Sequence, residues 1–142
     1  VSSEPCASMD IVPTILDAAG LDISKHYFDG KSLLELAKGK IDNEERILFW
    51  EYLDQTAVRR GKWKLVLKGK LIDAYGPVPE VHLANLEDDI SESNNLAEKE
   101  PEITKELKTL AENWRAQIEE KWIADYGAPN EEQRLNTQMG LK

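Results

Sequence analysis

Apolar residues recur with a helical period at the start of the chain. The wide face that they form consists of Met9, Val12, Leu16 and Ala19, flanked by Ile11, Ile15 and Ala18. This spacing predicts a helix over residues 10–19, which Ser8 or Asp10 caps and Gly20 ends. So much apolar surface on one short helix requires burial on more than one side.

Residues 20–46 are predicted to form a loop that contains one short helix. This helix runs from Ser32 to Lys38, with Ser32 or Asp29 as its cap and Gly39 as its stop. The first 46 residues are therefore expected to hold two helices joined by a loop.

From residue 47 the apolar pattern alternates with a period of two, which is typical of strands. Four runs are predicted as strands: Ile47–Leu53, Gln55–Arg60, Lys62–Leu67 and Val81–Leu86. The second and third flank Gly61 and indicate a hairpin with a tight turn. In the third run apolar and charged residues alternate, so one face of the sheet should be core and the other wet. An acidic turn, Glu87 to Asp89, follows the last strand.

A helical period returns at Pro101 and continues until Gly127 ends it. Its apolar stripe consists of Ile103, Leu107, Leu110, Trp114, Ile118 and Trp122. We expect Trp114 to lie against the sheet face that carries Trp63 and Leu65. Together the elements predict an α+β fold, in which a small antiparallel sheet of about four strands packs against a long C-terminal helix.

Composition and charge narrow the functional classes. The chain has 142 residues, 41% of them hydrophobic and 32% charged, as in one soluble domain. Its net charge is −9, and 16 of the 27 acidic side chains lie in residues 71–142, which argues against nucleic-acid binding.

No apolar run is long enough to span a membrane, and the N-terminus, with Glu4 and Pro5, is not expected to be a signal peptide. The single cysteine, Cys6, allows no internal disulfide.

Several short motifs occur in one order along the chain. They are Asp10-Ile-Val-Pro-Thr14, Asp29-Gly-Lys-Ser-Leu33, Arg46 before Phe49-Trp-Glu51, Ala57-Val-Arg-Arg-Gly-Lys-Trp-Lys-Leu65, Asp89-Ile-Ser-Glu92 and Asn95-Leu-Ala97. In this order and spacing they resemble the C-terminal subdomain of formylglycine-dependent sulfatases, in the alkaline-phosphatase superfamily. The resemblance implies that residues 1–46 are a helical strap from a preceding catalytic domain, residues 47–129 the subdomain, and residues 130–142 a mobile tail.

Three departures from the family pattern stand out. Ala84-Asn85 replaces a Tyr-Asp pair, and Ile90 replaces the turn proline. The Cys-x-Pro-Ser-Arg signature, whose cysteine becomes formylglycine, is absent, because Cys6 is followed by Ala-Ser-Met. The resemblance implies a formylglycine and a calcium ion for the parent enzyme, whereas this chain is expected to supply no catalytic residue, no metal ligand and no cofactor.

A basic strip gives the first candidate for substrate binding. It consists of Arg59, Arg60, Lys62, Lys64, Lys68 and Lys70, with no acid among them. Such a strip could attract a sulfated or otherwise anionic sugar, and Arg59 is the strongest candidate because guanidinium grips an anion with two bonds. The alternative is a solvated hairpin face whose edge lysines discourage strand pairing.

By the resemblance, Trp50, Glu51 and Tyr52 lie on the strand nearest the active-site rim. An aromatic ring there could stack on a sugar, and Glu51 could accept a hydroxyl hydrogen bond. Because neighbours on a strand face opposite ways, Trp50 and Glu51 cannot both face one ligand. Packing in the core is the alternative for Trp50. His26 and His82 are isolated and are not expected to bind a metal.

Three functional hypotheses follow. The leading one is the C-terminal part of a sulfatase, inactive alone, that helps wall the substrate cleft; its partners would be the catalytic domain, a sulfated substrate such as a glycan, and a second copy through residues 10–19. The resemblance is compatible with a periplasmic or secreted parent. The alternatives are a free-standing acidic protein-interaction module and a phosphoesterase relative of the same superfamily.

Overall fold

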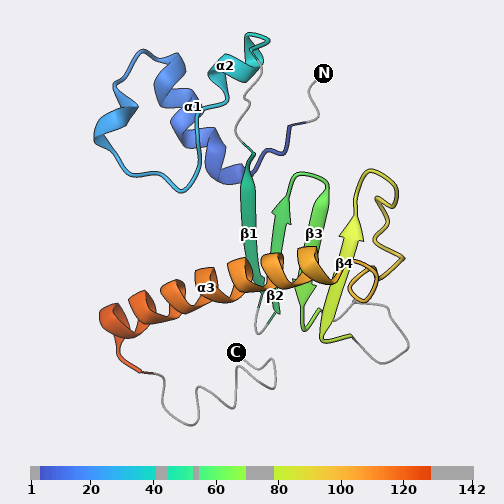
Figure 1. The fold of residues 1–142 in the computed structure, drawn as a ribbon. Helices are drawn as coiled ribbons and strands as arrows, with labels where there is room; N and C mark the ends of the chain where they lie inside the picture. The colour runs from blue at the N-terminus through green and yellow to red at the C-terminus, as the bar shows by residue number, and fades with distance from the viewer. Residues whose placement is uncertain (1–3, 41–44, 53–54, 70–78, 129–142) are drawn as a thin grey trace. The chain divides into compact units, whose positions relative to one another are not determined.

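The computed structural model describes residues 4–40, 45–52, 55–69 and 79–128. The chain divides into two compact units, Val1–Arg46 and Ile47–Lys142, and each is described by itself. The predicted mobile tail, residues 130–142, lies outside the described residues. Figure 1 shows the elements of both units.

The first unit is built from short helices. They are the 3-10 turns Ser8–Asp10 and Ile23–Lys25 and the α-helices α1 (Ile11–Ala18) and α2 (Leu34–Ala37). The predicted helices are present, but α2 is shorter than expected and its N-cap is Leu33, with no capping side chain. The Ser32 hydroxyl, one of the two expected caps, accepts the N–H of Leu34 at 3.2 Å and donates to Asp17 Oδ2 at 2.5 Å. This bond ties the start of α2 to the end of α1.

Asp10 joins three parts of the first unit. Its fully buried carboxylate accepts hydrogen bonds from the backbone N–H groups of Ala7 and Lys31, at 2.7 and 3.0 Å. The Arg46 guanidinium grips the same carboxylate at 2.6 and 2.5 Å. Asp10 is the N-cap residue of α1, as expected, but its side chain makes no cap hydrogen bond, because its oxygens accept hydrogen bonds from Arg46, Ala7 and Lys31. Two motifs far apart in the sequence meet at this residue.

A second contact closes the same loop. Thr14 donates its hydroxyl to the Asp10 carbonyl and accepts the N–H of Leu33 at 2.9 Å. Gly30 approaches the backbone of Met9 so closely that a Cβ atom would lie 2.2 Å from the Met9 carbonyl oxygen. Only glycine fits there, which explains the Asp-Gly step of the motif.

The second unit contains the predicted antiparallel sheet of four strands, in the order β1-β2-β3-β4. The strands are β1 (Ile47–Tyr52), β2 (Gln55–Arg60), β3 (Trp63–Leu67) and β4 (Val81–Asn85). Gly61 has a φ of 55° and makes the tight turn of the central hairpin, as predicted. The α+β fold expected from the sequence is confirmed.

The register places one apolar row across all four strands. Phe49 is opposite Val58, Val58 opposite Leu65, and Leu65 opposite Leu83. Because side chains alternate along a strand, this row faces one side of the sheet. The helix α3 (Pro101–Tyr126) crosses that side, shown in orange in Figure 1. The buried core consists of Val58, Leu65, Leu83, Leu107 and Ala111.

The stripe of α3 is only partly core. Leu107 and Ala111 are fully buried, whereas Ile118 and Trp122 are 44% and 54% exposed. The stripe therefore packs on the sheet only as far as Trp114, since the helix continues past β1 (Figure 1). Trp114 does lie on the predicted side of the sheet, where it stacks on Phe49 with centroids 5.1 Å apart.

The Asn95-Leu-Ala97 motif covers the outer edge of β4. The Asn95 side chain accepts the N–H groups of Leu83 and Ala97, both at 3.0 Å, and donates to the Val81 carbonyl at 2.9 Å. The Leu96 N–H donates to the Leu83 carbonyl at 2.8 Å. This segment therefore satisfies backbone groups that an edge strand would otherwise leave unpaired.

Candidate functional site

A hollow lies over the sheet face opposite α3. Its volume is about 500 Å³, and it is lined by Trp50, Ala57, Arg59, Lys64, Leu86, Ile90 and Glu92. The first four side chains project from β1, β2 and β3, and the other three belong to the turn that follows β4. The hollow thus combines an aromatic ring, two cations and a carboxylate.

Arg59 is held in place through one nitrogen of its guanidinium group. Its Nε donates to the carbonyl of Gly61 at 3.0 Å, across the turn of the hairpin. Within the described part of the chain the two terminal nitrogens of Arg59 have no hydrogen-bond acceptor. A guanidinium anchored in this way presents its terminal N–H groups in the fork geometry that suits sulfate or carboxylate.

Trp50 lies opposite Ala57 in the register, and both line the hollow. The indole is 43% exposed, so the alternative that Trp50 packs in the core is wrong. The small side chain of Ala57 leaves room beside the ring. An exposed aromatic ring next to a small residue offers a flat apolar surface to a ligand.

Lys64 and Glu92 form an ion pair at the hollow, with 2.5 Å between Lys64 Nζ and Glu92 Oε1. Both side chains are about three-quarters buried, at 27% and 26% exposure. Glu92 has a φ of 55°, a left-handed conformation that is uncommon for a residue with a side chain. The turn therefore holds the Glu92 carboxylate against Lys64 at some backbone cost.

Asp89 organises the turn that carries Glu92. Its carboxylate accepts hydrogen bonds from the Ser91 hydroxyl at 2.7 Å and from the backbone and side chain of Asn94 at 2.8 and 3.0 Å. The hydrogen bond from Ser91, followed by those from Asn94, lowers the pKa of Asp89 below its ordinary value. These contacts hold together the turn in which Ile90 follows Asp89.

The structure separates the four predicted substrate-binding residues. Trp50 and Arg59 line the same hollow, and Tyr52 projects on the same side of the sheet with 70% exposure. Glu51 faces the opposite side, where its carboxylate lies 3.3 Å from Arg115 Nη2 of α3. The geometry therefore brings two of the four residues together, and their role in binding stays a prediction.

The basic strip is also divided. Arg60 is bound by Glu106 of α3 at 2.5 and 2.8 Å, and Lys62 lies 3.7 Å from Glu87. The interpretation of these side chains as edge lysines is wrong, because β2 and β3 are the two central strands. Lys70 lies outside the described residues.

Sequence reasoning did not identify Leu86, Ile90 or Glu92 as lining residues. The amino-acid sequence around these three residues does not predict that the turn after β4 folds over β3. One signal in the sequence points to this contact: Lys64 and Glu92 have side chains of opposite charge and belong to two separate motifs. Such a pairing becomes visible only when the register of β3 and β4 is known.

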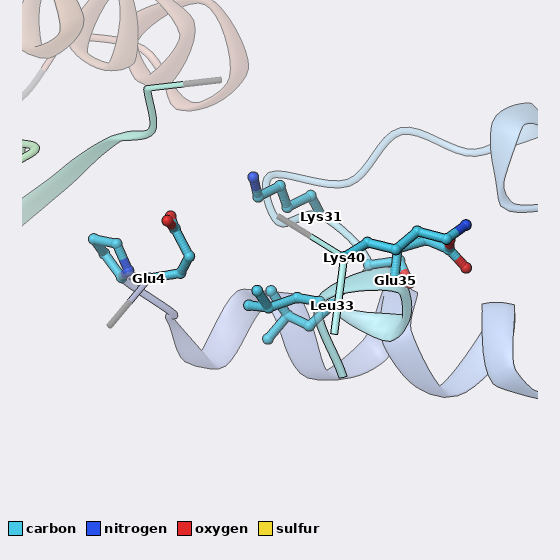
Figure 2. Close-up of a pocket in the computed structure, with 8 residues that line it drawn as sticks. Glu4, Lys31, Leu33, Glu35 and Lys40 are labelled. Carbon is cyan, nitrogen blue, oxygen red and sulfur yellow. The ribbon is translucent and has the colours of Figure 1, made fainter. Parts of the chain in front are cut away.

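A second hollow, of about 260 Å³, lies in the first unit and is lined in part by Glu4, Lys31, Leu33, Glu35 and Lys40 (Figure 2). Its charges balance, and the Glu35 carboxylate is already paired with Lys38 at 2.8 Å and with Lys40. The hydrogen bonds from Lys38 and then Lys40 lower the pKa of Glu35 to about 2. None of its described lining residues is aromatic, so it is the weaker candidate.

The described residues do not form a group of side chains that could bind a metal ion or carry out catalysis. Among them, no three His, Cys, Asp or Glu side chains gather as they would around a metal ion. Cys6 is exposed and donates weakly to the Glu4 carbonyl at 3.4 Å. The described residues therefore do not fit the calcium ion or the formylglycine that the resemblance implies. No helix of the described part has both the length and the apolar character needed to cross a membrane.

Residues 1–120 match the protein family described as N-sulphoglucosamine sulphohydrolase, C-terminal. This chain belongs to that family of sulfatase C-terminal domains. An uncharacterized sulfatase of Schizosaccharomyces pombe is 30% identical over 118 residues, which are 75% of this chain and 20% of that protein. The chain thus spans about one fifth of this curated relative.

Solved structures share the fold of this sulfatase C-terminal domain. Ps i-CgsB matches 79% of the chain at 21% identity with a TM-score of 0.58, and its complex with k-i-k-neocarrahexaose gives a TM-score of 0.60. A Bacteroides thetaiotaomicron protein labelled 6S-sulf, from work on the metabolism of multiple glycosaminoglycans, matches 75% of the chain at 23% identity with a TM-score of 0.58. In each case the match covers 24% of the solved chain.

Proposed function

We propose that this sulfatase C-terminal domain forms one wall of the substrate cleft in an enzyme that hydrolyses a sulfate ester. The observation that carries the proposal is the hollow on the sheet face opposite α3, where Trp50 and Arg59 converge. An aromatic surface beside an anchored guanidinium suits a sulfated sugar, since one group covers the ring and the other binds the anion. A complex of Ps i-CgsB with an oligosaccharide supports a glycan as the substrate class.

The chemistry of ester hydrolysis would come from the catalytic domain of the parent. A formylglycine and a calcium ion in that domain would supply the nucleophile and the positive charge that sulfate-ester hydrolysis needs. The contribution of this chain is to bind and orient the substrate, which changes catalysis by positioning and not by bond breaking. The isolated chain is therefore inactive.

The catalytic domain is the proposed partner of the first unit. Ile11, Val12 and Ile15 of α1 are 57%, 54% and 61% exposed, which is unusual for three apolar side chains on one short helix. In the parent a neighbouring surface would cover them. Without that surface, a second copy of the chain is the proposed substitute, which gives self-association through residues 10–19.

The reading frame of the gene tests this proposal. We expect codons for a Cys-x-Pro-Ser-Arg or Ser-x-Pro-Ser-Arg sequence upstream of Val1 and in the same frame, and we expect the protein made from the whole frame to cleave an aryl sulfate. The 142-residue chain assayed in parallel should show no turnover. A frame that begins near Val1 would favour an interaction module, and a threonine nucleophile with phosphodiester turnover would favour a phosphoesterase.

A further inference from the structure

We propose that the hollow beside Trp50 binds one sugar ring that carries a single anionic group, and that this ring is not the one whose ester is cleaved. The inference rests on the proposed function and specifies which part of a substrate the hollow holds. Three properties of the lining carry it: its charge balance, its aromatic surface and its lack of a reactive group.

The charge balance sets the number of anionic groups. Among the described residues two cations line the hollow, but Lys64 is neutralised by Glu92 at 2.5 Å. Within the described residues, Arg59 uses only its Nε, which donates to the Gly61 carbonyl. One positive charge remains available, and it suits one sulfate or carboxylate. A second anionic group on the same ring would find no free cation in this lining, because the Lys64 ammonium is already paired with the Glu92 carboxylate.

The neutral part of the lining suits the remainder of a sugar ring. The indole of Trp50 is 43% exposed beside the small Ala57, and Ile90, which is 87% exposed, lies on the turn that lines the other part of the hollow. The C–H face of a sugar is apolar and packs on such surfaces. The Glu92 carboxylate can accept a hydrogen bond from a ring hydroxyl, and the Lys64 ammonium can donate one.

The described residues that line the hollow contain no nucleophile matched with a base and no cluster of metal ligands. A ring bound there is held and is not attacked. Binding energy from such a remote ring can be used to raise the rate at the reacting centre. The parent enzyme is therefore selective for a glycan of at least two rings over a single sulfated sugar.

Titration of the isotope-labelled chain, followed by NMR, tests this inference. The probes are glucose, glucose 6-sulfate, a glucose disulfate and inorganic sulfate. We expect glucose 6-sulfate to bind at least tenfold more tightly than glucose and than inorganic sulfate, with shifts of the Trp50 indole N–H and the Arg59 Nε–H signals. Equal binding of glucose and glucose 6-sulfate, or no binding of either, would overturn the inference.

Four variants separate the contributions. Arg59→Ala should abolish the preference for the sulfated sugar, whereas Lys68→Ala, which removes a charge outside the hollow, should leave it unchanged. Trp50→Ala should weaken the binding of both sugars at least fivefold and leave that of inorganic sulfate unaltered. Glu92→Gln should tighten the binding of the disulfate at least threefold relative to the monosulfate. A uniform loss across all probes in a variant with an intact amide spectrum would contradict these roles.

The outcome is independent of the test of the proposed function. If the upstream frame encodes the nucleophile and the chain binds none of the probes, the subsite is wrong and the sulfatase assignment stands. If the chain binds glucose 6-sulfate and the frame encodes no nucleophile, the hollow is a sugar site in a protein that is not a sulfatase.

Discussion

Phe49 of β1 and Trp114 of α3 stack with an interplanar angle of 5° and a centroid distance of 5.1 Å. This contact lies at the edge strand, beyond the fully buried pair Leu107 and Ala111, and it fixes where α3 crosses the sheet. Stacked aromatic pairs contribute about 0.5–1.5 kcal/mol beyond the burial of their area. A double-mutant cycle of Phe49→Leu and Trp114→Leu in urea unfolding should give a coupling free energy in that range, and a coupling near zero would contradict the contact.

The helix face toward the sheet should matter far more for stability than the opposite face. Trp114→Ala removes the ring that packs on Phe49, and we expect it to lower the free energy of unfolding by about 3 kcal/mol. Glu112 on the exposed side makes only a 3.8 Å ion pair with Lys108, so Glu112→Ala should change it by less than about 0.5 kcal/mol. Equal urea midpoints for the two variants would refute the packing of α3.

Asp10 should make the first unit sensitive to acid. Burial alone would raise the pKa of Asp10, but the hydrogen bonds from Arg46, Ala7 and Lys31 outweigh it and lower the pKa from 3.8 to about 2. Because the folded state holds the proton less tightly than the unfolded state, this stabilisation is present above about pH 4 and is lost as the pH falls toward 2. It amounts to about 2 kcal/mol.

Hydrogen exchange at the Lys31 and Leu33 amides measures this effect. Asp10→Asn should raise their exchange rates at neutral pH at least tenfold, since it leaves the Arg46 charge buried without its partner carboxylate. Asp29→Asn, an exposed acid in the same loop, is the matched control and should leave the rates unchanged. Equal exchange rates of these amides in Asp10→Asn and in the wild type would show that the Asp10–Arg46 ion pair does not hold the first unit together.

Asn95 should be much more important than its neighbour Asn94. Asn95→Ala removes three hydrogen bonds to the backbone around β4, and we expect a loss of about 2–3 kcal/mol, because the Leu83 N–H and the Val81 carbonyl lose a partner. The side chain of Asn94 makes one exposed bond to Asp89, so Asn94→Ala should cost less than about 1 kcal/mol. Thermal unfolding of both variants checks the difference.

The apolar face of α1 should drive self-association of the isolated chain. Sedimentation velocity over a hundredfold range of concentration should show a dimer or larger species for the wild type. Ile15→Lys, which places a charge on the exposed face, should shift the chain to monomer, since a charge is costly to bury in an interface. A monomer at all concentrations in the wild type would contradict the proposed role of this face.

The elements of the fold follow from local sequence signals, whereas the lining of the hollow does not. Gly61 and the alternation in β3 predict the hairpin, because turn chemistry and period are local properties. Ile118 looks like the rest of the stripe and yet is half exposed, since the width of the sheet is not encoded in the helix. The contact of Glu92 with Lys64 likewise depends on the path of a turn over the sheet.

Enzyme kinetics on the protein made from the whole reading frame can show whether this domain binds substrate. We expect Arg59→Ala to lower kcat/KM for a sulfated oligosaccharide at least tenfold and to change kcat/KM for a small aryl sulfate by less than twofold, because Arg59 binds a part of the substrate that the small ester lacks. Lys68→Ala should change neither value. An equal loss on both substrates, or no loss on either, would contradict the claim that this domain contributes substrate binding and no chemistry.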